Sequence, residues 1–526
     1  MKLWLLLVSS LASAAPYIAY RGVVNAASYA PGGLPNGPIA RGSVFTIFGK
    51  ELGPTAAQQV SSFPLATTFA GVSISVTQNT TTVAAIPLYV SATQINAIMP
   101  SSAPLGRVTL RVTYNNQTSN SAYLETTGVS LGLYSIYAGA GPGIFQNFIG
   151  PAEQPINSLI STARHGQVVT LWGTGLGAVA SDTTAPAAGD LPTPVEVFVG
   201  SQPARKLYSG RSPCCAGSDQ IVFEIPQDAP QGCYVPVTVR AGGKSSNTVT
   251  IAIESQNNAC QDPANPLGSP TIEKRNTGII ITNMIRGPER IHANAFAHFE
   301  EQSGPFRFHP LQALPPVGSC AVYAGKANLG LRDFLPSFPL SGPVLAAAAS
   351  LAFGAIQLVK PAVADPFYFW QFTFPTNGVT HTVRPGTETL QAPAGQTVGP
   401  LQASVPRIDF PGATFPALNT IRRADSLELR WAATASSSDL VVVAGSALNR
   451  PTNSAAHFLC LAAANSGRFT IPSFVLSSLP AAKNDAQGAA ALAIGRIGAP
   501  ADLAATGLLK SLALYTAFDY KLVEVQ

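Results

Sequence analysis

Histidine and glutamate side chains gather in one stretch of the chain, where they are candidates for metal chemistry. The stretch contains His292, His298, Glu300, Glu301 and His309. Successive side chains of a β-strand point to opposite faces, so His298 and Glu300 would share a face and could hold a metal with a third ligand. Metal sites need three or four converging ligands, and this spacing brings only two together. We therefore expect a solvated strand face near a hairpin, with no metal-binding or cofactor-binding residues.

Sequence motifs of common catalytic sites do not occur in the chain. There is no Gly-x-Ser-x-Gly turn that would expose a nucleophilic serine. Residues 243–245 (Gly-Lys-Ser) end like a phosphate-binding loop, but the first glycine of that motif is replaced by Thr238. Glu300 and Glu301 are adjacent, so on a strand they point apart and cannot act together on one bond. We predict no catalytic residue and a protein that is not an enzyme.

A run of aromatic residues at 367–374 (Phe-Tyr-Phe-Trp-Gln-Phe-Thr-Phe) is a candidate ligand surface. Alternate residues of a strand share a face, so Tyr368, Trp370 and Phe372 could form a platform on which a sugar ring stacks. More often, such a run is the core strand of a sandwich. Both interpretations predict a strand here.

Six cysteines indicate an oxidising compartment, and they are Cys214, Cys215, Cys233, Cys260, Cys320 and Cys460. The chain has no Cys-x-x-Cys pair and no histidine at zinc-finger spacing. A structural zinc site of that kind is therefore not expected. A bond between the neighbours Cys214 and Cys215 would strain the peptide between them. We therefore expect one of these two to pair with Cys233 and the other with Cys260. Cys320 and Cys460 would then close a loop of about 140 residues, worth ~4–5 kcal/mol in the chain-entropy model.

Short β-strands would position these residues, and the clearest strand pattern occurs twice. Residues 42–53 (Gly-Ser-Val-Phe-Thr-Ile-Phe-Gly-Lys-Glu-Leu-Gly) are repeated at 166–177 (Gly-Gln-Val-Val-Thr-Leu-Trp-Gly-Thr-Gly-Leu-Gly) with six identical positions. Apolar residues alternate in both copies up to a glycine and a tight Leu-Gly turn, which is typical of a strand. The strand patterns that follow keep the same order in both copies. The sequence therefore predicts an internal duplication.

The duplication predicts an all-β protein with tandem immunoglobulin-like β-sandwiches at residues 22–130 and 134–254. Each copy holds some seven short strands, and no amphipathic helix separates them. The polar, proline-containing stretch 255–271 is predicted to be a linker. Residues 272–526 are again rich in strand patterns, with one short helix at 473–479. A break near residue 376 could divide this β-rich C-terminal region into two subdomains.

The N-terminus predicts export from the cell. Met1-Lys2 is positively charged, residues 3–8 are apolar, and Ala12-Ser13-Ala14 is a small-x-small cleavage signal. These three parts form a signal peptide, residues 1–14. Residues 343–359 are uncharged but number only 17, short of the ~20 that a membrane-spanning helix needs. We expect two buried strands joined by a turn there, and no membrane span.

The overall composition suits an extracellular β-protein. Charged residues make up only 11% of the chain, against ~25% in an average soluble domain. The formal net charge is +5, and there is no run of lysine and arginine. Nucleic-acid binding therefore has no electrostatic support.

Several motifs resemble a known family. Residues 22–29 (Gly-Val-Val-Asn-Ala-Ala-Ser-Tyr), 42–49 and 89–96 (Tyr-Val-Ser-Ala-Thr-Gln-Ile-Asn) look like the tandem modules of secreted Solibacter-type proteins from acidobacteria. Residues 212–217 (Ser-Pro-Cys-Cys-Ala-Gly) and 232–237 (Gly-Cys-Tyr-Val-Pro-Val) resemble the same family. The resemblance covers about residues 22–254. It implies an IPT/TIG-like, immunoglobulin-type fold on exported proteins, and it implies no activity.

Together these features predict a secreted or cell-surface multi-domain β-sandwich protein that is not an enzyme. Its expected role is binding, adhesion or scaffolding, with an extracellular polysaccharide or another surface protein as the partner. The alternative is a secreted glycan hydrolase whose catalytic part lies in 272–526, with the immunoglobulin-like units as spacers. Converging carboxylates in a cleft of the C-terminal region would favour that alternative.

Overall fold

The computed structural model describes residues 14–254, 259–270, 272–310, 312–327, 345, 347, 350–353, 356–359, 367–375, 383–384, 386–417, 419–435, 439–509 and 511–526. For residues 353, 356 and 367–375 the description covers the backbone only. The predicted signal peptide therefore lies, but for Ala14, outside the described residues. Within them the chain is almost entirely β, which confirms the predicted fold class. No helix among the described residues is long and apolar enough to span a bilayer.

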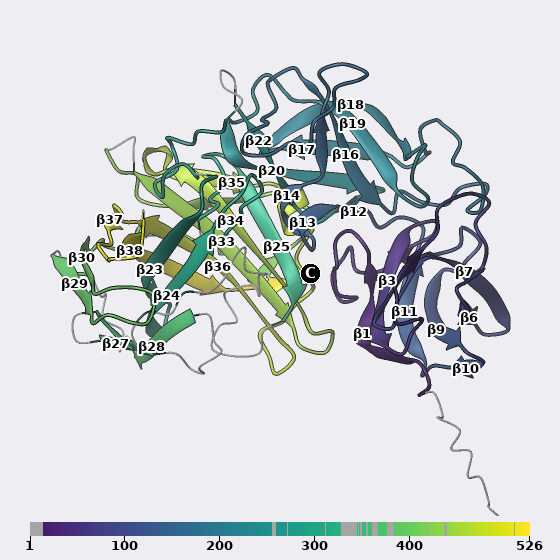
Figure 1. Ribbon diagram of the computed structural model, residues 1–526. Coiled ribbons are helices and arrows are strands. Elements are labelled where there is room, and N and C mark those ends of the chain that lie inside the picture. Colours follow the sequence, from purple (N-terminus) through teal and green to yellow (C-terminus); the bar gives the residue numbers. More distant parts are fainter. Residues whose placement is uncertain are drawn as a thin grey trace, which may run out of the picture.

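The first unit, residues 17–127, is a sandwich (Figure 1) in which one long strand pairs with different strands along its two halves. In the strand β7, residues 81–85 pair with β6 and residues 86–90 pair with β8, and the register shifts between Pro87 and Tyr89. Alternate residues of β6 (Val72, Ile74 and Val76) are buried, as the period of two predicts. The strands are β1 (Tyr17–Asn25), β2 (Ile39–Ala40), β3 (Val44–Lys50), β4 (Gln58–Gln59), β5 (Thr68–Phe69), β6 (Val72–Gln78), β7 (Thr81–Val90), β8 (Gln94–Ile98), β9 (Gly106–Tyr114), β10 (Gln117–Thr118) and β11 (Ala122–Thr127).

The second unit, residues 132–253, repeats this architecture. The order β3-β8-β7-β6-β9-β11 of the first unit corresponds to β16-β19-β18-β17-β20-β22 in the second. Phe48 lies opposite Gln94, and Trp172 lies opposite Gln220 at the equivalent place, which confirms the predicted duplication. The strands are β12 (Gly132–Leu133), β13 (Ser135–Tyr137), β14 (Ala140–Gly143), β15 (Phe145–Asn147), β16 (Val168–Thr174), β17 (Val195–Val199), β18 (Gln202–Arg211), β19 (Asp219–Glu224), β20 (Gly232–Ala241), β21 (Lys244–Ser245) and β22 (Val249–Ile253).

The C-terminal sheet is one long sheet with the order β25-β34-β33-β36-β38-β23-β24-β28-β27-β26-β29-β30. Strands from before and after residue 376 belong to this one sheet, so the sheet is not divided at that point. Its strands are β23 (Arg275–Arg286), β24 (Arg290–Gln302), β25 (Cys320–Lys326), β26 (Ser350–Phe353), β27 (Ile356–Val359), β28 (Phe367–Pro375), β29 (Thr387–Ala392), β30 (Leu401–Pro406), β33 (Leu440–Asn449), β34 (Ser454–Ala463), β36 (Gly488–Ile497), β37 (Ala501–Asp502) and β38 (Leu512–Leu522).

Smaller elements complete the C-terminal region. They are β31 (Thr420–Ile421), β32 (Leu427–Arg430), β35 (Arg468–Ile471), β39 (Glu524–Val525), a 3-10 turn at Ala464–Ser466 and the helix α1 (Ser473–Leu476). The helix begins after Pro472 as predicted and ends three residues earlier than expected. Within 343–359, β26 and β27 pair as antiparallel strands with Leu351 and Leu358 buried, as predicted.

Buried polar contacts join the first unit to the second. The guanidinium of Arg211, 4% exposed, donates to the carbonyl oxygens of Gly42 (2.7 Å) and Gly177 (2.6 Å) and forms an ion pair with Asp219. Asp219 also accepts hydrogen bonds from the amides of Gly175 (2.7 Å) and Leu176 (2.8 Å). The unit boundary is therefore held by a satisfied buried charge pair.

The disulfides correct part of the predicted pairing. Cys320 and Cys460 lie directly opposite each other on β25 and β34 and are bonded, as expected. Cys214 is bonded to its neighbour Cys215, and Cys233 is bonded to Cys260. The expectation that one of the neighbours would reach Cys233 and the other Cys260 was therefore wrong. The adjacent cysteines lie in an exposed bend after β18, and their bond forms there despite the strain expected in the peptide between them.

Candidate functional site

The candidate site is a cluster of two histidines and a glutamate at the end of β24. His298 and Glu300 lie on the same face of this strand, as their spacing predicted. His309 comes from the docking loop, which we define as residues 303–310 and 312–319 between β24 and β25. The three side chains are 1%, 1% and 5% exposed. The strand face is therefore buried, and the prediction that it would be solvated was wrong, because the docking loop folds back over it.

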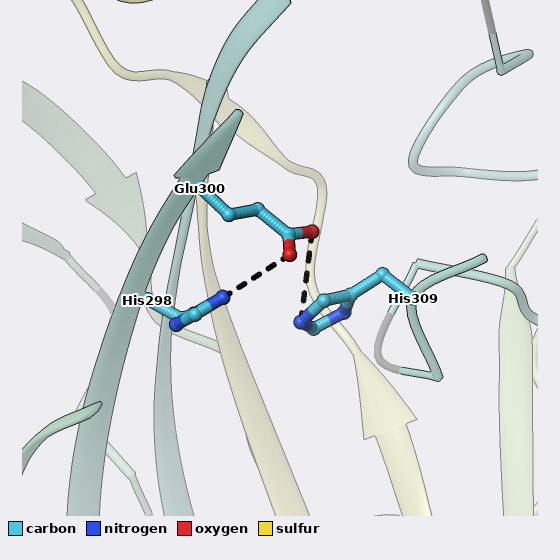
Figure 2. A group of neighbouring side chains, drawn as sticks. All are labelled: His298, Glu300 and His309. Carbon is cyan, nitrogen blue, oxygen red and sulfur yellow. Dashed lines mark ion pairs between the residues drawn. The ribbon is translucent and has the colours of Figure 1, made fainter. Parts of the chain in front are cut away.

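The three side chains converge on the carboxylate of Glu300 (Figure 2). The distance from His298 Nε2 to Glu300 Oε2 is 3.4 Å, and that from His309 Nε2 to Glu300 Oε1 is 4.0 Å. The two imidazole rings stack with their centroids 5.2 Å apart. One potential ligand atom from each residue lies within 4.8 Å of the others. The spacing along the strand brings only two ligands together, and the tertiary fold brings in the third.

The environment sets the protonation states of the cluster. Burial lowers the pKa of His309 to about 4, although Glu300 acts in the opposite direction. Burial raises the pKa of Glu300, but the hydrogen bond from His298 and the proximity of His309 together outweigh it, so the pKa is lowered overall. A neutral imidazole and an ionised carboxylate therefore face each other near neutral pH. These are the forms in which histidine and glutamate bind metal ions.

The docking loop attaches the cluster to the second unit. Phe308, adjacent to His309, packs among Tyr137 and Tyr234 of the second unit and Tyr323 of β25. The hydroxyl of Tyr234 donates to the carbonyl of Arg307 at 3.0 Å, and the Leu159 amide donates to the carbonyl of Pro305 at 3.0 Å. The cluster thus lies beside the contact between the second unit and the C-terminal sheet.

A small cavity adjoins the docking loop. Its lining includes Tyr234, Arg275, Arg307 and Gln312, and its volume is about 40 Å³. A cavity of this size has room for about three or four water molecules, since one water occupies roughly 10–15 Å³ by the same measure. The cavity suits bound water better than a sugar ring.

The other sequence candidates lie apart from this cluster. Glu301 points to the opposite face of β24 and forms an ion pair with Lys274 at 2.8 Å. His292 lies six residues earlier on the same strand, with Nε2 3.4 Å from the hydroxyl of Tyr520. The aromatic run forms the predicted strand β28, which pairs with β24. The side chains of Tyr368, Trp370 and Phe372 are outside the described residues, so the sugar platform stays a prediction.

Sequence reasoning included His309 in the cluster but did not identify it as a ligand. Eight residues separate it from Glu300 along the chain, and no strand or helix period relates the two positions. The sequence feature that could have indicated this third ligand was the density of histidines in the stretch.

Comparison with known proteins adds little to this picture. No protein-family model and no curated protein matches the chain. Solved structures that align with it include the plexin A4 extracellular region (10% identity, TM-score 0.13), domains 5–6 of the S-layer protein SbsC (11%, 0.16) and the titin I-band fragment I67–I69 (8%, 0.14). These alignments cover 67%, 46% and 74% of this chain and 31%, 100% and 96% of the other chains. At such TM-scores the alignments carry no argument about fold or function.

Proposed function

We propose that this chain is an exported scaffold that holds a binding surface outside the cell and is not an enzyme. The observation that carries the proposal is the set of contacts that join the three β-sheet units. Arg211 joins the first unit to the second, as described above. Phe198 of the second unit stacks on Phe474 of the C-terminal region with ring centroids 4.3 Å apart. Ser245 donates to the carbonyl of Phe474 at 2.8 Å.

Contacts of this kind are what a scaffolding or spacing protein requires. Domains of one chain move relative to each other unless their interface is large and apolar. Here, Ala30 and Leu34 of the first unit contribute to the same buried core as Trp431 and Phe474 of the C-terminal region. The first unit is thus packed against both of the others, and a partner bound to one unit would be held at a fixed position.

The proposed binding surface lies on the first unit. Tyr20 and Tyr123 are 80% and 67% exposed, on β1 and β11, which lie side by side (Figure 1). The guanidinium of Arg21 lies 5.1 Å from the ring centre of Tyr20, and that of Arg107 lies 5.2 Å from the ring centre of Tyr123. Exposed tyrosines beside arginines favour a polysaccharide or a protein partner, because flat aromatic rings stack on sugars and are enriched in protein interfaces.

Three further features support export. The N-terminal sequence has the three parts of a signal peptide. All six cysteines are in disulfides, which persist in oxidising compartments. The motifs shared with secreted Solibacter-type proteins lie in the units with an immunoglobulin-like strand pattern, and we assign these units to the IPT/TIG-like group on that resemblance. The same features support localisation outside the cell or on its surface.

A polysaccharide array probed with the mature, oxidised protein tests this function. We expect binding without release of sugar, and at least a tenfold loss of affinity in the double variant Tyr20→Ala/Tyr123→Ala. The control is Ile149→Ala, which removes an apolar side chain of the second unit that is 58% exposed and should leave binding unchanged. Release of sugar from any polysaccharide would support the glycan hydrolase instead. Binding that survives in the tyrosine variant would place the surface elsewhere.

A further inference from the structure

We propose that His298, Glu300 and His309 bind one divalent transition-metal ion, best fitted by Zn²⁺, and that this ion fastens the docking loop to β24. Two imidazoles and one carboxylate are an established ligand set for zinc. The inference concerns the joint between the second unit and the C-terminal sheet, and it does not depend on the proposed binding function.

The distances from Glu300 to the two histidines are close to those of a tetrahedral site, and one potential ligand atom of each histidine lies within 4.8 Å of the other. Zinc binds histidine nitrogen and carboxylate oxygen at about 2.0–2.2 Å, which places two ligand atoms of a tetrahedron about 3.3–3.6 Å apart. The 3.4 Å between His298 and Glu300 already has this value. The 4.0 Å between His309 and Glu300 requires a closure of roughly half an ångström. That movement falls on the docking loop, which carries His309.

The groups around the ligands also suit a metal site. Carboxylates that bind metals are usually held by a hydrogen bond from a neighbouring side chain. Here, Gln302, on the same face of β24, donates from Nε2 to Glu300 Oε1 and lies 3.1 Å from Gln312 Oε1. The Oε1 atom of Gln302 is buried and has no hydrogen-bond partner among the described residues. A water molecule in the fourth position of the ion would supply that missing donor.

The burial of the site points to a structural role. Three protein ligands and a water are also the ligand set of catalytic zinc sites, but a catalytic site keeps its water position open to substrate. Here the three ligands are buried, so a water in the fourth position would not be accessible to a substrate. The docking loop both stacks His309 on His298 and packs Phe308 against the second unit. An ion that joins His309 to β24 would therefore also hold Phe308 in its contact with Tyr234.

Metal binding by the full-length mature protein tests this inference. The protein is stripped with a chelator, and Co²⁺ is then added while the visible absorption of tetrahedral cobalt is recorded. Zn²⁺ is measured by elemental analysis after dialysis. We expect one equivalent of either ion, and slower amide exchange in residues 303–310 and 312–319 when Zn²⁺ is present. The loss of the cobalt bands on addition of Zn²⁺ would show that both ions share one site.

Two conservative variants and one control locate the ion. Glu300→Gln keeps the shape of the side chain and removes its charge, and His309→Asn removes the ligand of the docking loop. Each should lower the affinity at least tenfold. His292→Asn is the matched control, because it changes a histidine of the same strand outside the cluster and should bind one equivalent. Circular dichroism checks that every variant is folded.

Clear outcomes would overturn the proposal. If the wild-type protein retains less than a tenth of an equivalent after dialysis against a low excess of Zn²⁺, the cluster is a hydrogen-bonded group without an ion. This measurement needs no variant, so it stands even if Glu300→Gln does not fold. Binding that is equally strong in Glu300→Gln and His309→Asn would show that the ion sits elsewhere.

Discussion

Truncation of the Arg211 side chain should weaken the contact between the first and second units. The Arg211→Ala substitution removes the charge partner of Asp219, which is fully buried, and the donors to the carbonyls of Gly42 and Gly177. Removing one member of a buried, hydrogen-bonded ion pair typically costs about 3–5 kcal/mol, because the other charge stays buried without compensation. We expect a local free-energy loss in this range.

The pH dependence of this loss of free energy follows from the titration of the Asp219 carboxyl. Burial raises its pKa, whereas Arg211 and the amides of Leu176 and Gly175 act in the opposite direction. Without Arg211 the pKa in the folded state rises further above that of the unfolded chain. A group with a raised folded pKa stabilises the protein at low pH and loses this effect as the pH rises. The variant should therefore be closer to wild type at pH 5 than at pH 7.5.

Amide hydrogen exchange in a peptide that covers Gly175 and Leu176 measures the effect, because both amides donate to Asp219. Global unfolding of a chain with three β-sheet units is not two-state, so a local probe is required. A loss of about 3–5 kcal/mol corresponds to exchange that is about a hundred to a few thousand times faster.

The matched control for this experiment is the double variant Arg211→Met/Asp219→Asn. It removes both charges but keeps an amide oxygen that can accept from Gly175 and Leu176. It should lose less than Arg211→Ala, since no charge is left buried alone. If exchange in Arg211→Ala rises less than tenfold, or if the double variant is equally affected, the assignment of the joint to this ion pair is wrong.

Three further predictions concern the disulfide, a glycine and a histidine. Cys320→Ala/Cys460→Ala removes a link across 140 residues, which should cost about 5 kcal/mol in the chain-entropy model and appear as a lower denaturation midpoint. Gly217→Ala, with φ at +71° and a Cβ that would lie 2.7 Å from Val44, should cost about 2–3 kcal/mol, against about 1 kcal/mol for Gly243→Ala, whose φ is +80° in open space; amide exchange in peptides that cover each glycine compares the two. Burial lowers the pKa of His457 from 6.5 to about 4, so local stability should fall by at most about 3 kcal/mol as the pH drops from 6.5 to 4, and amide exchange in a peptide that covers His457 should show a smaller drop in His457→Gln.

Local patterns in the sequence are sufficient to predict the main strands of the first two units. Residues 42–53 and 166–177 form strands at equivalent places because their alternation of apolar residues requires one buried face. The duplicated order of patterns then determines the order of the strands in the sheets. In the C-terminal region the same reasoning predicts strands but not their single sheet, in which β23 pairs in parallel with β38 from the far end of the chain.

The disulfides show the limit of reasoning from neighbours in sequence. If the other four cysteines pair among themselves, Cys320 and Cys460 are the two that remain. In the structure they meet because β25 lies beside β34. The pairing of Cys233 with Cys260 depends on where the chain runs after β22, which no local pattern encodes. The strain expected in a bond between neighbouring cysteines argues against pairing Cys214 with Cys215. The structure nevertheless contains this bond.

The sequence likewise predicts only part of the candidate site, and the tertiary structure completes it. The period of two along a strand is enough to place His298 and Glu300 on one face. Their burial and the approach of His309 depend on the docking loop, whose Phe308 packs in an apolar cluster with Tyr234 and Tyr323. That cluster is formed by residues from two units, so only the tertiary structure could turn a pair of ligands into a triad.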